Sequence, residues 1–154
     1  MNISPKFLKR MLNVYPPYLG AGVKVDYLSE DWKELHVSMA MRWYNRNAVG
    51  VHFKGSLYSM IDPHLMLLLM QLLGKEYLVW DKTATIEFIK ASKKKVRSII
   101  KISDEDLEEI RSNTGSGEKY FAKFFIEIKD ADGELVARCE KVIYVRKKLQ
   151  QGKS

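Results

Sequence analysis

The stretch that decides the fold runs from Asn47 to Gly74 and reads NAVGVHFKGSLYSMIDPHLMLLLMQLLG. It begins as a loop punctuated by glycines and becomes an apolar run with no Lys, Arg, Asp or Glu after Asp62. Apolar residues recur at i, i+3, i+4 and i+7 and also fill much of the other side, which indicates a helix buried on most faces. Those with this spacing are Leu57, Met60, Ile61, Leu65, Leu68, Leu69 and Leu72. The stretch therefore predicts one long central helix that ends at Gly74.

The segments on either side of this helix alternate between apolar and polar residues, as half-buried strands do. Strands are predicted at 23–28 and 34–42, which pair with each other, and at 77–90, 96–102, 120–128 and 135–146. Short helices are predicted at 4–15, ended by Pro16-Pro17, and at 103–110, where Ser103 begins a capping box. We therefore expect one α+β domain over residues 1–154, with an antiparallel core at 22–146 and a frayed tail at 147–154.

Composition narrows the class of protein. The 26 basic and 19 acidic residues give a net charge of +7, which suits an anionic partner or simply a soluble domain. Cys139 is the only cysteine, so neither an intramolecular disulfide nor a cysteine-based metal site is possible, and we expect it in the core. The apolar run contains Asp62 and Pro63 and is too short for a membrane span, and no signal peptide precedes it. A cytoplasmic protein is expected.

The loop before the central helix carries a motif. Hotdog-fold thioesterases, above all the phenylacetate-pathway type and related uncharacterised hotdog families, have N-x-x-G-x-x-H-G-G here, with an acid nine residues after the histidine. The positions of this chain that match without a gap are Asn47, Gly50, Gly55 and Asp62. Phe53 stands at the histidine position and Lys54 at the first glycine. The chain resembles this superfamily over about residues 22–146.

The resemblance implies a hotdog fold, in which an antiparallel sheet wraps around one long central helix. It implies hydrolysis of an acyl-CoA or acyl-carrier thioester, with no cofactor besides the coenzyme A of the substrate. Asp62 would be the general base or nucleophile at a homodimer interface, with a dimer of dimers as the larger assembly. Asn47 would position the substrate or water, and Gly55 would let backbone N–H groups approach the thioester oxygen. Because Phe53 departs from the pattern, the alternative is a non-catalytic hotdog domain that binds acyl groups or a protein partner.

Asp62 itself has two interpretations. Burial among apolar neighbours would make its carboxylate a better proton acceptor, which suits a general base. An Asp before Pro also commonly caps a helix, so Asp62 could instead cap a segment that begins at Pro63. The matches at Asn47 and Gly55 favour the catalytic interpretation.

The remaining candidates would bind the substrate. They are Lys54, Ser56, Tyr58, Lys90 and Lys93. Lys90 and Lys93 belong to a basic cluster at 90–97 that either contacts the phosphates of coenzyme A or forms a solvated turn that protects the sheet edge. The three histidines lack metal-ligand spacing, so no metal site is expected. No nucleic-acid-binding motif is present, so no such partner is expected.

Overall fold

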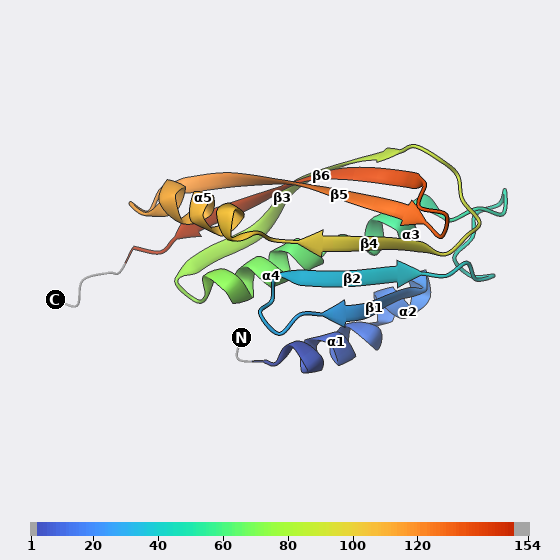
Figure 1. Ribbon diagram of the computed structural model, residues 1–154, viewed down its shortest axis with the longest axis horizontal. Coiled ribbons are helices and arrows are strands. Elements are labelled where there is room, and N and C mark those ends of the chain that lie inside the picture. The colour runs from blue at the N-terminus through green and yellow to red at the C-terminus, as the bar shows by residue number, and fades with distance from the viewer. Residues whose placement is uncertain (1–2, 150–154) are drawn as a thin grey trace.

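A curved antiparallel sheet wraps around the central helical stretch in the computed structural model, which describes residues 3–149 (Figure 1). The strands are β1 (Val23–Leu28), β2 (Glu34–Met39), β3 (Tyr77–Phe88), β4 (Val96–Lys101), β5 (Lys119–Asp130) and β6 (Leu135–Lys147). They form one six-stranded sheet in the order β1-β2-β4-β5-β6-β3, so β1 and β3 are its edges. The predicted pairing of the first two strands is confirmed, as are the α+β class and the sheet around a helix.

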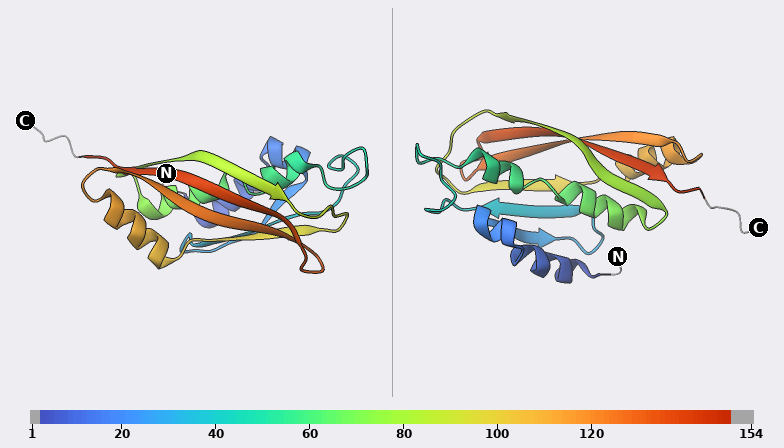
Figure 2. Two further views of the ribbon diagram at one scale, coloured as in Figure 1. Left: turned by 90° about the horizontal axis from the view of Figure 1, so that it is seen from above. Right: turned by 180° about the vertical axis from the view of Figure 1, so that it is seen from behind.

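The central helix consists of two segments rather than one. The helices of the chain are α1 (Pro5–Asn13), α2 (Pro16–Ala21), α3 (Lys54–Ser59), α4 (His64–Leu73) and α5 (Asp104–Thr114). Figure 2 shows α3 and α4 lying end to end across one face of the sheet. Helix α2 was missed, because Pro16-Pro17 opens this helix instead of only ending α1. Proline suits the first turn of a helix, where no N–H partner is needed.

The core lies between the sheet and α4. The helix buries His64, Leu65, Leu68, Leu69 and Leu73. Alternate residues of β6 face the same core and are buried: Ala137, Cys139, Lys141, Ile143 and Val145. Cys139 is thus a core residue, as expected. By length and composition, 54–73 is the single stretch of the described chain that could cross a membrane, but half of its apolar window is buried inside the domain.

The chain ends in a long hairpin, β5–β6, whose turn has Gly133 at φ 81°. Strand β6 continues to Lys147, into the segment 147–154 that was predicted to be a frayed tail, because Lys147 pairs with Tyr77 of β3. The N–H of Lys148 then donates to the carbonyl oxygen of Glu76 at 2.7 Å. The expected fraying at 150–154 lies outside the described residues.

Gly22 ends α2 in the left-handed region, with φ 77°. A Cβ atom there would lie 2.5 Å from Nδ2 of Asn45, a buried side chain that donates to the carbonyl oxygens of Ala21 and Ala40. We therefore expect Gly22→Ala to lower the free energy of unfolding by about 1–2 kcal/mol in urea denaturation.

The matched control is Gly20→Ala, because Gly20 lies inside α2 with nothing within 4 Å of its added Cβ. Alanine favours the helix, so this variant should be as stable as wild type or more stable by up to about 1 kcal/mol. Equal stability of Gly22→Ala and wild type would contradict the argument.

Candidate active site

Asp62 lies in the turn that separates α3 from α4. Pro63 has no N–H and so cannot donate to the carbonyl group four residues earlier, which interrupts the helix at this point. The carboxylate accepts a hydrogen bond from the hydroxyl of Tyr58 at 2.7 Å. Its side chain is 47% exposed, so the expectation that Asp62 is buried among its apolar neighbours is wrong. The turn directs the carboxylate to the margin of the core, where solvent reaches it.

The capping alternative for Asp62 is also wrong. Helix α4 begins at His64, its N-cap residue is Pro63, and no side chain caps it. The carboxylate of Asp62 is directed instead toward Tyr58 and toward Lys141, whose Nζ lies 3.5 Å from Oδ1. The contacts of the Asp62 carboxylate thus come from side chains and not from the first turn of α4.

Lys141 is the residue that the sequence interpretation missed. It lies in the middle of β6, is completely buried, and faces the turn that holds Asp62. Its Nζ also lies 2.8 Å from Oδ1 of Asp81 on β3. One ammonium group is thus placed between two carboxylates. The signal was present in the sequence, because Lys141 falls on the apolar side of an alternating strand between Cys139 and Ile143.

A second buried polar pair lies beside Asp62. The hydroxyl of Tyr18, from α2, lies 2.6 Å from Nε2 of His64. Burial, together with the charge of Lys141, lowers the pKa of His64 to about 3, so the imidazole is neutral. Burial raises the pKa of Tyr18, and burial and the hydrogen bond to Asp62 raise that of Tyr58, so both phenols stay protonated.

Asn47 shapes its own loop. Its Oδ1 accepts hydrogen bonds from the N–H groups of Val49 at 3.0 Å and Val51 at 3.2 Å. Its own N–H donates to the carbonyl oxygen of Val51 at 2.8 Å. The side-chain oxygen is therefore occupied within the loop, and the amide NH₂ group is the part of Asn47 that could contact a ligand.

Gly55 lies in the first turn of α3 beneath the ring of Phe53. A Cβ atom at Gly55 would lie 2.6 Å from Cε1 of that ring, so only glycine leaves room for it. The N–H groups of Lys54 and Gly55 open the helix and have no acceptor within it. The close approach that was expected for a substrate is thus made by an aromatic ring of the chain itself.

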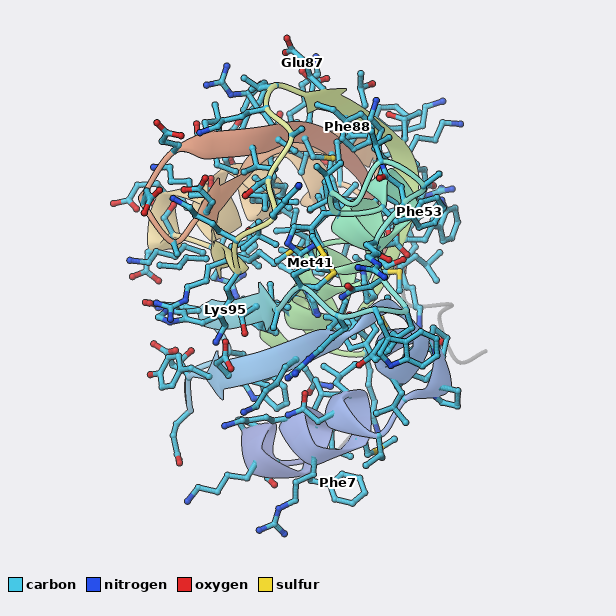
Figure 3. All side chains as sticks on the ribbon, turned by 90° about the vertical axis from the view of Figure 1, so that its right-hand side faces the viewer. Phe7, Met41, Phe53, Glu87, Phe88 and Lys95 are labelled. Carbon is cyan, nitrogen blue, oxygen red and sulfur yellow. The ribbon has the colours of Figure 1, made fainter. Side chains whose placement is uncertain are left out.

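The other candidates near α3 differ in exposure. Nζ of Lys54 lies 4.9 Å from the centre of the Phe88 ring. Figure 3 shows Phe53 and Phe88 on the same end of the molecule. Ser56 is buried, and its backbone N–H donates to the carbonyl oxygen of Phe53 at 3.0 Å. Lys54 is exposed and accessible to a ligand, whereas the side chain of Ser56 is not.

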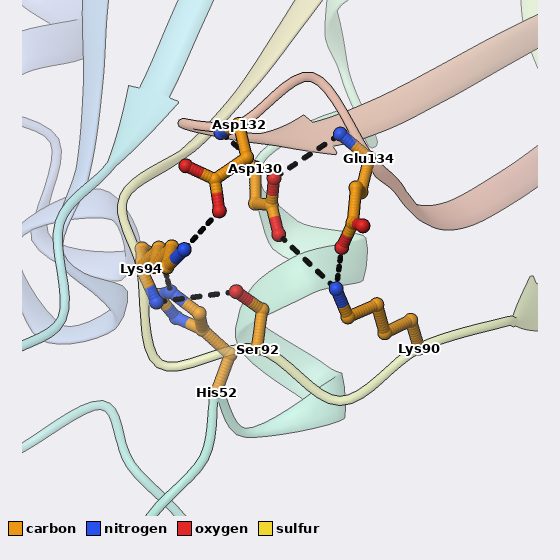
Figure 4. A network of polar contacts seen from close by, with 7 residues as sticks. All are labelled: His52, Lys90, Ser92, Lys94, Asp130, Asp132 and Glu134. Atoms are coloured by element: carbon orange, nitrogen blue, oxygen red, sulfur yellow. Dashed lines mark hydrogen bonds and ion pairs between the residues drawn. The ribbon is translucent and has the colours of Figure 1, made fainter.

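The basic cluster at 90–97 faces the acidic turn of the last hairpin (Figure 4). Lys90 forms ion pairs with Glu134 and with the buried Asp130, and Lys94 forms one with Asp132. The charge of Lys90 is thus paired within the chain. Lys93 forms no ion pair with the described residues, so it is the candidate with a charge to spare for a phosphate.

A groove of about 780 Å³ lies between the end of α4 and the start of β3. Its apolar wall includes Met70, Leu78 and Trp80, all of them well exposed. Since β3 is an edge strand, the groove lies beside a sheet edge that is open in the single chain. Asp81, on the same strand, connects this edge to Lys141 and through it to Asp62.

Three solved structures share this architecture. A protein of unknown function from Pseudomonas aeruginosa, described as a probable thioesterase, has a TM-score of 0.75 at 18% identity, covering 93% of this chain and 96% of its own. A protein of unknown function from Chlorobaculum tepidum has a TM-score of 0.72 at 15% identity, covering 95% of this chain and 98% of its own. A thioesterase from Haemophilus influenzae has a TM-score of 0.68 at 11% identity, covering 99% of this chain and 97% of its own. The chain therefore has the hotdog fold that the motif implied.

Comparison of the sequence with protein families shows the family to which the chain belongs. A family model described as a domain of unknown function, DUF4442, matches residues 4–145, and the chain belongs to that family. No curated protein matches the chain.

Proposed function

We propose that the protein hydrolyses an acyl thioester and that Asp62 supplies the reactive carboxylate. The observation that carries the proposal is the half-exposed carboxylate of Asp62, held by Tyr58 and Lys141 at the break of the central helix. Such a carboxylate takes a proton from water while the water oxygen attacks the thioester carbonyl carbon. The carbon–sulfur bond then breaks, the thiolate takes a proton, and a carboxylic acid and a thiol leave. Solved thioesterases with the same fold support this class of reaction.

The start of α3 is the proposed place for the thioester oxygen. The N–H groups of Lys54 and Gly55 have no acceptor in their helix, and donors of this kind stabilise a developing oxyanion. The ring of Phe53 lies over Gly55, so it must turn aside or pack along the acyl chain. The side chains of Lys54 and Tyr58, and the amide NH₂ of Asn47, are the nearest candidates for further contacts; Ser56 would contribute only its backbone.

The proposed site is completed by a second subunit. Strand β3 is an edge with exposed Leu78 and Trp80, and pairing of two such edges would cover the groove beside α4. On the outer face of the sheet, Phe121 and Phe125 are 40% and 68% exposed, and packing of two dimers would cover them. Light scattering on the purified chain measures the resulting dimer or tetramer.

The proposed substrate is an acyl group on coenzyme A or on a carrier protein, both of which carry phosphate near the thioester arm. Lys93 is our candidate for the phosphate at 90–97, because Lys90 and Lys94 are paired with the acidic turn; Lys95 and Arg97, which also form no ion pair among the described residues, could assist it. In this proposal Lys90 contributes only if it leaves Glu134.

The test is hydrolysis of a panel of acyl-CoA esters, which includes acyl chains of increasing length and aromatic acyl groups. The release of free thiol measures the rate. Turnover of at least one ester above the uncatalysed rate is expected. No turnover of any acyl-CoA or acyl-carrier ester would overturn the proposal.

One observation favours a second candidate function, a non-catalytic acyl-binding domain. The ring of Phe53 occupies the space above Gly55 where the substrate carbonyl would approach. In that case acyl-CoA raises the thermal unfolding temperature without being cleaved. Phe53→His, which restores the residue of the resembling families, then gives no hydrolysis either.

A further inference from the structure

Lys141 is the most deeply buried charged side chain among the described residues, at 0% exposure in the middle of β6. Removing an ammonium group from water is costly unless charges and hydrogen bonds in the protein replace the water. A methionine or leucine at this inward-facing position would pack without that cost. A lysine at this position must therefore be stabilised by charged or polar partners inside the protein.

Those partners are concentrated on the active-site turn. Nζ of Lys141 donates to the backbone carbonyl oxygen of Asp62 and lies 3.5 Å from Oδ1 of the same residue. It lies 2.8 Å from Oδ1 of Asp81 and 5.9 Å from the centre of the Tyr58 ring. A single ammonium group thus contacts both the main chain and the side chain of the carboxylate to which we assign the chemistry.

The contact to the main chain coincides with the break in the helix. Helix α4 begins only at His64, so the carbonyl group of Asp62 lies before it, and a carbonyl group at the margin of the core is unfavourable without a donor. Lys141 supplies the donor for the carbonyl group of Asp62 from the neighbouring sheet. It therefore holds the turn in one conformation, with its ammonium group 3.5 Å from the carboxylate that the turn carries.

We propose that Lys141 is a positioning residue for Asp62: anchored in β6, it fixes the turn between α3 and α4 and keeps the Asp62 carboxylate aimed at the substrate. This inference rests on the proposed function for its effect on the rate, although the effect on Asp62 is measurable without turnover. Lys141 itself does not touch the substrate, because it is fully buried beneath the turn.

Other groups that titrate or carry charge surround Asp62 and belong to the same electrostatic environment. They are Tyr18 of α2, Tyr58 of α3, His64 of α4, Asp81 of β3 and Cys139 of β6. The tyrosines and His64 are neutral near pH 7, and burial raises the pKa of Cys139, so its thiol is neutral as well. Lys141 is thus the cation that balances Asp62 and Asp81.

The experiment compares wild type, Lys141→Met and Lys24→Met, with the last as matched control because Lys24 is exposed on β1, the edge of the sheet opposite β3. For Lys141→Met we expect kcat to fall by about tenfold or more with KM within about threefold, since the turn but not the groove is altered. Lys24→Met should match wild type in both quantities.

A double variant separates positioning from folding. Lys141→Met alone leaves Asp81 without its cation and could unfold, so Asp81→Asn/Lys141→Met removes that imbalance while Asp62 still lacks its partner. The carbon-13 chemical shift of the Asp62 carboxyl carbon, compared at the same pH between Asp81→Asn and the double variant, gives a readout independent of turnover. These two proteins differ only at Lys141, so the signal should move when the ammonium group is absent.

The outcomes distinguish this inference from the proposed function. If wild type cleaves no thioester, the proposed function fails while the carbon-13 signal of Asp62 still decides the role of Lys141. If wild type is active and Lys141→Met keeps its kcat, or if the carbon-13 signal does not move, the role of Lys141 is refuted and the role of Asp62 stands.

Discussion

In the Asp62→Asn variant we expect kcat for the best thioester substrate to fall by about 100- to 10,000-fold, the usual effect of removing a general base. The amide has nearly the same shape, and its oxygen still accepts the hydrogen bond from Tyr58. It cannot take a proton from water, however. Since the substrate contacts are kept, KM should change little, and the loss should lie in the chemical step. Release of free thiol under saturating substrate measures it.

The matched control for this substitution is Asp26→Asn, because Asp26 is an exposed aspartate of β1, on the far edge of the sheet from β3. It should retain the wild-type kcat. Thermal unfolding of both variants shows whether either has lost its fold. The Asp62→Asn variant is expected to fold, because the buried Lys141 still has Asp81 as its counter-ion. An active Asp62→Asn variant would remove Asp62 from the chemistry, whatever the substrate.

The second large effect is a loss of stability in mild acid that depends on His64. In the folded chain the pKa of His64 is lowered to about 3, mainly by burial. In the unfolded chain a histidine titrates near pH 6.5. Between these values only the unfolded state binds the proton, so stability is full above about pH 6.5 and falls with decreasing pH at up to about 1.4 kcal/mol per unit. From pH 7 to pH 5 the histidine should cost about 2 kcal/mol.

The measurement is urea denaturation of wild type and His64→Gln across this range. Glutamine keeps a polar group near the hydroxyl of Tyr18 but does not titrate. The variant has a lower stability at pH 7, and the gap to wild type should narrow by about 2 kcal/mol by pH 5. Other groups contribute to the acid response of both proteins and cancel in the difference. A gap that stays constant with pH would show that His64 binds its proton equally well in the folded and unfolded states, which would contradict the argument.

Much of the fold was readable from local patterns. The alternation in 120–128 and 135–146 led to the β5–β6 hairpin, and the capping box at Ser103 led to α5. The apolar run after Asp62 led to the helix against the sheet. Helix α2 was missed because proline opens helices as readily as it follows them, and only the next turn of the chain distinguishes the two.

The candidate site was less predictable, because its contacts join segments far apart in the chain. Asp62, Asn47 and Gly55 were identified from the motif in the sequence. The sequence offered Asp62 as a buried general base or as a helix cap and favoured the first; neither setting is the one observed, because the contacts of Asp62 depend on Lys141, 79 residues later. Lys90 was assigned to a phosphate although its charge is paired with an acidic turn that only the folded chain brings close.

The sequence by itself determined an antiparallel sheet around a central helix, since strand alternation and helical periodicity are local properties. The resemblance carried by the motif from Asn47 to Asp62 added the hotdog fold. It also singled out Asp62 in the stretch from Asn47 to Gly74. Only the tertiary structure decided what holds that carboxylate. A strand from the far end of the chain places the buried ammonium group of Lys141 under the break at Pro63, and such a pairing between distant segments follows from packing and leaves no local pattern.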